Sequence, residues 1–244
     1  MKLGIMQSYF FPYFGYFQLV NSVDTFCLYE HVTFRKRSWI TRNRILDKGN
    51  QEPRYINIPV KNKSSFKAIG EISIDDSTNW RRTILDALYF NYKKAPFFES
   101  SYDVLERMIN LKIENLHDYN SEIVVNISRW LECSTSIVSK SEKAVETELE
   151  NGLIDHTLDI KTNRVVKLCR LYGASHYVNP TGGVALYCKD SFTRNGLELS
   201  FLDSHIEEYE QWGESYTPHL SIIDMMMHLS REKMQHLLKS YSLS

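Results

Sequence analysis

Two arginines and an asparagine in a row, Arg42, Asn43 and Arg44, are well suited to binding an anion. A guanidinium group donates two parallel hydrogen bonds, which fit the oxygens of a carboxylate or a phosphate. The amide of Asn43 is suited to hold a hydroxyl or amide group of the same ligand. We therefore predict that these three residues bind substrate. A basic face exposed to solvent is the alternative interpretation.

A candidate general base stands at Glu30 and His31, directly after an apolar segment over 25–29 that is predicted to be a buried strand. Open α/β sheets carry their sites at such strand ends. A carboxylate or an imidazole in this place could accept a proton from an attacking amine. Successive strand residues point to opposite faces, so only one of the two is expected to face the site, and we prefer Glu30. Capping of the strand end without chemistry is the alternative.

A glycine-containing segment, from Asn179 to Gly183, follows a predicted strand over 176–178 and precedes a predicted helix over 184–195. Glycines let the backbone approach a ligand closely, and the N–H groups that begin a helix bind an anion or a developing oxyanion. Asn179, Gly182 and Gly183 are therefore predicted to contact substrate. The segment lacks the lysine and glycine spacing of a P-loop or dinucleotide fingerprint, and a structural turn is the alternative.

The spacing of Ser221 and Asp224 is that of a capping box, at the start of a predicted helix that continues through three methionines. Capping is a sufficient structural reason for both residues. The methionines are expected to pack in the core.

The elements that must position these residues indicate an α/β fold with a mostly parallel, open sheet. An apolar strand before Gln7, an aromatic loop, an amphipathic helix over 16–22 and the strand over 25–29 form a β-loop-α-β start. Further strands are predicted over 55–60, 69–74, 135–139 and 197–202, and a helix over 162–172, ended by Gly173. Helical periodicity over 80–130 predicts an all-helical insertion within a single domain, 1–244, and the charged segment 142–151 is an exposed helix or a loop.

The β-loop-α-β start has the outline of an adenylyl-transferring α/β domain, in which the first loop ends in Gly-His at a helix N-terminus. Gly15 and Tyr16 occupy that place here, without the histidine. The helix N-terminus still favours an anion. We therefore predict substrate contacts for Gln7, Tyr9 and Tyr16. The alternative is that the aromatic residues of this loop are core.

Composition narrows the class of protein. Hydrophobic residues make up 43% and charged residues 24%, and the formal net charge is −1, which provides no general attraction to DNA or to an anionic membrane. The four cysteines are widely spaced, so buried free thiols are expected rather than disulfides or a metal site. The start of the chain is unlike a signal peptide, and no apolar run reaches the roughly 20 residues of a membrane span. We predict a cytoplasmic protein.

Several motifs resemble the WbqC-like family and occur in the same order. The family usually has proline at the place of Ser8, and an Asp-Asp pair at the place of Glu30 and His31. Because Asp224 lies within one of the motifs, it joins Glu30 and His31 as a catalytic candidate. The motifs are Gln7-x-Tyr9-Phe10-Phe11-Pro12-Tyr13-x-Gly15-Tyr16-Phe17-Gln18, Arg42-Asn43-Arg44, Tyr177-Val178-Asn179-Pro180-x-Gly182-Gly183 and Leu220-Ser221-Ile222-Ile223-Asp224.

This resemblance implies a transferase of bacterial surface-polysaccharide (O-antigen, lipopolysaccharide) biosynthesis. Such an enzyme would attach glycine or a related acyl group to the amine of an amino sugar or sugar nucleotide. Its donor stays open between ATP-activated glycine, a thioester and a charged tRNA. Two alternatives remain: a nucleotidyl transferase-like enzyme that uses ATP, and a non-catalytic sugar-nucleotide binding protein. The oligomeric state is not predicted.

Overall fold

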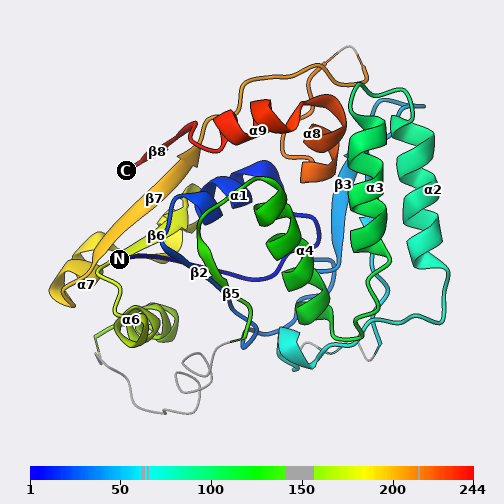
Figure 1. Cartoon of the computed structure of the whole chain (residues 1–244). Coiled ribbons are helices and arrows are strands. Elements are labelled where there is room, and N and C mark those ends of the chain that lie inside the picture. Colours follow the sequence, from blue (N-terminus) through cyan, green and yellow to red (C-terminus); the bar gives the residue numbers. More distant parts are fainter. Residues whose placement is uncertain (62–63, 65, 141–156, 214) are drawn as a thin grey trace.

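The computed structural model describes residues 1–61, 64, 66–140, 157–213 and 215–244, and the predicted charged segment 142–151 lies outside them. A six-stranded sheet in the order β5-β2-β1-β6-β7-β8 forms its centre (Figure 1). All neighbours are parallel except β8, which pairs antiparallel with β7. This arrangement confirms the predicted α/β fold with a mostly parallel sheet. The strands are β1 (Lys2–Met6), β2 (Thr25–Leu28), β5 (Ser136–Val138), β6 (His176–Pro180), β7 (Glu198–Ser204) and β8 (Tyr241–Leu243).

The β-loop-α-β start is formed by β1, α1 (Phe14–Asn21) and β2. Every residue of α1 from Phe14 to Val20 is buried, because the sheet covers one side of the helix and the C-terminal segment another. Gln18 makes the second contact: its amide donates to the carbonyls of Leu237 and Ser240 at 2.8 and 2.9 Å. The helix therefore fixes where the loop between β1 and α1 lies.

The Arg42 triplet lies in a separate antiparallel hairpin of β3 (Arg42–Leu46) and β4 (Pro53–Asn57). The strand predicted over 55–60 thus begins earlier and stays outside the parallel sheet. The strand predicted over 69–74 is wrong: a 3-10 helix, η1 (Ile69–Glu71), occupies its start. The reason is local, because the Glu71 carboxylate accepts the Ala68 N–H at 2.7 Å and closes a turn.

Helices occupy most of the predicted insertion, as α2 (Trp80–Tyr92), α3 (Phe98–Ile109) and α4 (Leu116–Trp130). Figure 1 shows α2 and α3 beside the hairpin and α4 beside α1. That the whole chain forms one domain stays a prediction. Of the helices in the described residues, none has both the length and the apolar character that crossing a bilayer would need. The later helices are α6 (Ile160–Tyr172), ended by Gly173 at φ 68°, α7 (Lys189–Arg194), α8 (Ile222–His228) and α9 (Arg231–Leu237).

The four cysteines are free, as predicted, although Cys133 is only partly buried and Cys188 is exposed. Burial raises the pKa of the thiols of Cys27, Cys133 and Cys169 from 9.0 to about 12. The folded state thus favours the protonated thiol, and the resulting stability is complete below pH 9 and lost as pH rises toward 12.

We expect the urea midpoint of unfolding to fall as pH rises from about 8 to about 10, because unfolding then releases protons from these thiols. The slope should be smaller in Cys169→Ala, and Cys188→Ser should keep the wild-type slope. A midpoint that is independent of pH over this range would contradict the assignment.

Candidate functional site at the carboxyl ends of β1 and β2

Glu30 and His31 follow β2 after one intervening residue, Tyr29, at the carboxyl edge of the sheet. One Glu30 oxygen, Oε1, lies 3.6 Å from His31 Nε2, so the two side chains are neighbours. The expectation of opposite faces is wrong, because β2 ends at Leu28 and strand alternation stops there. Glu30 is 8% exposed, and its Oε2 accepts no hydrogen bond from the described residues. A buried carboxylate oxygen without a donor is available to accept a proton.

His117 is a member of this cluster that sequence reasoning missed. It lies on α4, is fully buried, and places Nε2 3.8 Å from Glu30 Oε2. The Ser139 carbonyl, 2.6 Å from Nε2, can only accept, so geometry assigns the proton to Nε2. Nδ1 is then free to accept from the Ser8 hydroxyl at 3.0 Å. A buried polar stripe on α4, made of His117, Asn120 and Ser121, was the signal that could have found it.

Buried side chains hold the loop between β1 and α1 in place through hydrogen bonds to its backbone. Asn120 donates to the carbonyls of Ser8 and Ile40 at 2.9 and 2.8 Å. Tyr16 donates its hydroxyl to the Gln7 carbonyl at 2.8 Å, and burial raises its pKa well above the usual value, which keeps it a donor. Tyr16 is fully buried, which favours support of the loop over the predicted contact with substrate. Gln7 and Tyr9 are only partly buried and stay candidates for substrate contact.

Asn43 is also a support of this loop rather than an exposed ligand group. It is 3% exposed, and its amide donates to the carbonyls of Phe10 and Phe11 at 3.0 and 2.7 Å. Phe11 has φ 41°, a backbone conformation that is costly for a side chain of this size. Ser221 donates a further bond to the Phe11 carbonyl at 2.8 Å. Several bonds therefore hold one strained residue in place.

We expect Asn43→Asp to lower the free energy of unfolding by at least about 2 kcal/mol, since a carboxylate cannot donate to two buried carbonyls. Urea denaturation measures the change. Asn57→Asp is the matched control, because Asn57 pairs with Arg42 in the same hairpin but is exposed. Equal losses in the two variants would show that the amide of Asn43 does not hold the loop.

Arg42 and Arg44 flank Asn43 and lie against aromatic rings. The Arg42 guanidinium is 4.2 Å from the centre of the Tyr55 ring, and that of Arg44 is 5.7 Å from the Trp39 ring. Arg44 also donates to the His219 carbonyl at 3.3 Å. Both Nε atoms are buried without a hydrogen-bond partner among the described residues. Rings that hold guanidinium groups flat prepare them to bind an anion.

The glycine segment after β6 has a different local structure from the prediction. Asn179 is buried and donates to the Tyr177 hydroxyl at 2.8 Å. A Cβ on Gly183 would lie 2.8 Å from Asn179 Oδ1, so close packing explains this glycine, whereas nothing approaches Gly182. The helix predicted over 184–195 is replaced by a 3-10 helix, η2 (Thr181–Leu186), and the short α7. No α-helix begins at the glycines, which instead lie in the first turn of η2, and substrate contact by Asn179, Gly182 and Gly183 stays a prediction.

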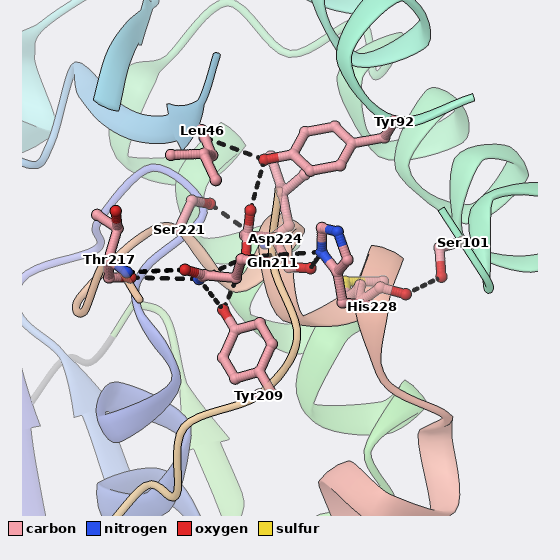
Figure 2. A network of polar contacts seen from close by, with 11 residues as sticks. Leu46, Tyr92, Ser101, Tyr209, Gln211, Thr217, Ser221, Asp224 and His228 are labelled. Carbon is pink, nitrogen blue, oxygen red and sulfur yellow. Dashed lines mark hydrogen bonds and ion pairs between the residues drawn. The ribbon is translucent and has the colours of Figure 1, made fainter. Parts of the chain in front are cut away.

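Asp224 is the centre of a buried polar network (Figure 2). Its Oδ2 accepts from the Tyr92 hydroxyl at 2.8 Å, and its Oδ1 accepts from Tyr209 and Gln211 at 2.8 and 2.9 Å. The predicted capping box is therefore wrong: Ser221 is the N-cap, but the Asp224 carboxylate points into the network. Within the described residues, none of its hydrogen bonds reaches Glu30 or His117. The geometry favours a structural part for Asp224 over the predicted catalytic one.

A model of the WbqC-like protein family matches residues 7–236. The chain belongs to this family. It is 28% identical over 238 residues to the uncharacterized protein Rv1507c of Mycobacterium tuberculosis, with 97% of each chain covered. No solved structure matches the chain.

Three of the WbqC-like motifs meet at Phe11 in the structure. The first motif contains Phe11 itself, the arginine triplet supplies Asn43, and the C-terminal motif supplies Ser221, which also donates its N–H to the Arg44 carbonyl at 2.8 Å. The loop that lies between the Glu30 cluster and the arginines is thus built by distant segments. Its conformation links the two parts of the candidate site.

Proposed function

We propose that the protein is a transferase of surface-polysaccharide biosynthesis, which joins glycine or a related acyl group to the amine of an amino sugar or sugar nucleotide. Resemblance to the WbqC-like family supports the pathway. The observation that carries the chemistry is the buried Glu30 carboxylate near the carboxyl end of β2, which has His31 beside Oε1 and His117 beside Oε2 and whose Oε2 has no hydrogen-bond partner among the described residues. An amine must lose a proton to become an amide, and Glu30 is the base.

In the proposed reaction the neutral amine attacks the carbonyl carbon of an activated acyl donor. A C–N bond forms, and the bond from the acyl carbon to the leaving group breaks. The amine proton passes to Glu30 Oε2 and then to the leaving oxygen or sulfur, so the carboxylate is regenerated. His117 keeps its proton on Nε2, toward the Ser139 carbonyl, and acts as a positioning residue for the Glu30 carboxylate. Gln7 and Tyr9, on the adjacent loop, orient the substrate.

Arg42, next to this loop, binds the anionic part of the substrate, a diphosphate or a carboxylate. Activation of glycine by ATP, by a thioester or on a charged tRNA is compatible with this base. Nucleotidyl transfer has less support, because Tyr16 stands at the position of the phosphate-contacting histidine and is fully buried.

The test is incubation of the purified protein with an amino-sugar nucleotide and either glycyl-coenzyme A or glycine with ATP. Mass spectrometry of the sugar nucleotide should show the addition of one glycyl unit, which heat-denatured protein does not produce. Release of pyrophosphate from ATP without a glycyl product would favour nucleotidyl transfer instead. Sugar-nucleotide binding without any product, with all donors including glycyl-tRNA, would favour the non-catalytic alternative.

A further inference from the structure

A cavity of about 650 Å³ lies between the β3–β4 hairpin, the segment 34–41 and the first turns of α2. Its size is within the range of roughly 300–1,000 Å³ that is usual for sites of small molecules. The segment 34–41 starts a few residues after Glu30, so one stretch of chain joins the proposed base to this cavity.

The cavity is strongly basic. Lys36, Arg37, Arg42 and Arg54 line it, and none of its described lining residues is acidic. Arg54 is neutralised by Asp47 at 3.1 Å, whereas no ion pair within the described residues involves the other three. Arg37 has φ 58°, a strained conformation in a tight turn. Three positive charges in one cavity, without acidic partners in the part of the chain that the structure describes, indicate an anionic ligand.

The two arginines of the triplet differ in their relation to the cavity. Arg42 lines it and has a buried Nε without a hydrogen-bond partner. Arg44 is not part of the lining, and its guanidinium donates to the His219 carbonyl. The anion contact is therefore assigned to Arg42, and Arg44 serves the junction with the C-terminal motif.

The start of α2 also borders the cavity. Thr78, Asn79 and Trp80 line the cavity, the N-cap Asn79 makes no side-chain capping bond, and the first turn has no acidic residue. The N–H groups at this helix end thus lack a capping side chain and are open to an anion, while the Asp76 carboxylate close by is engaged by Trp80 Nε1 at 2.8 Å and by Arg81. The cavity also has an apolar wall, which is formed by Ile56, Ile58 and Ile84.

We propose that this cavity binds the diphosphate ester of the sugar substrate, with Lys36, Arg37 and Arg42 on the phosphates and the apolar wall against the organic group of the ester. The choice of a sugar diphosphate rests on the proposed function. The binding itself does not require turnover. The organic group is the nucleoside of a sugar nucleotide or the chain of a lipid-linked sugar.

Calorimetric titration with UDP, inorganic pyrophosphate, geranyl diphosphate and uridine tests this proposal. A diphosphate ester should bind, and uridine should not. Arg42→Gln should weaken binding by at least about tenfold, since it removes a charge-assisted contact, and Lys36→Gln with Arg37→Gln should do the same. Affinity should also fall with added salt.

Arg129→Gln is the matched control, because Arg129 is an exposed arginine on α4 outside the cavity, and it should bind as the wild type does. Tighter binding of UDP than of geranyl diphosphate supports a sugar nucleotide, and the reverse supports a lipid-linked sugar.

Absence of binding for all three diphosphates, or equal affinity of Arg42→Gln and the wild type, would overturn the proposal. Because no product is measured, this result is independent of the transfer assay. If the protein transfers glycine but binds no diphosphate, the proposed function stands and the proposal that the cavity binds a diphosphate is refuted.

Discussion

Replacing Asp224 with alanine is expected to lower the free energy of unfolding by at least about 3 kcal/mol. The carboxylate is fully buried and accepts hydrogen bonds from Tyr92, Tyr209 and Gln211. Removal would leave the buried Tyr92 hydroxyl and the partly buried Tyr209 and Gln211 donors without their acceptor, together with a cavity. These donors come from α2 and from the segment before α8, so the loss would loosen the contact between them.

Urea denaturation measures this change, with Asp86→Ala as the matched control. Asp86 is an exposed residue of α2 that pairs only at the surface with Arg82, so its loss should cost no more than about 0.5 kcal/mol. Asp224→Asn separates structure from chemistry, because the amide retains one acceptor oxygen. It should recover part of the stability lost in Asp224→Ala and retain most of the transfer activity. Wild-type stability with abolished activity would instead make Asp224 catalytic.

Replacing Glu30 with glutamine is expected to lower the rate of transfer by about 10²–10⁴-fold, the usual contribution of a general base. Glutamine has nearly the same shape but cannot accept the proton of the amine. The stability of the fold should not fall, because Glu30 Oε2 has no hydrogen-bond donor among the described residues and the buried charge is removed. Lower activity at equal or higher stability is the pattern of a functional residue.

The transfer assay and urea denaturation together test this prediction. Glu122→Gln, an exposed glutamate of α4, is the control and should change neither activity nor stability appreciably. Transfer at the wild-type rate by Glu30→Gln would exclude Glu30 as the base. Loss of stability and activity together would mean that Glu30 supports the fold.

The sequence alone determined the α/β class, the β-loop-α-β start, the helices of 80–130 and the position of Glu30 at a strand end. Each of these depends on local signals: the period of the apolar residues, turn residues and the alternation of strands with helices. The strand predicted over 69–74 and the helix predicted over 184–195 are wrong because they, too, depend on local signals. There, turns such as the one closed by Glu71 compete with a regular element over a few residues.

Only the tertiary structure decided which of the candidate residues meet. Ser8 and His117 are 109 positions apart, and Ser221 reaches Phe11 across 210. The tertiary structure also shows that Asn43 and Tyr16 support the loop and that Asp224 lies in a buried network. It places a basic cavity beside Arg42. A side-chain hydrogen bond between distant segments depends on how whole elements pack, and no periodicity along the chain records that packing.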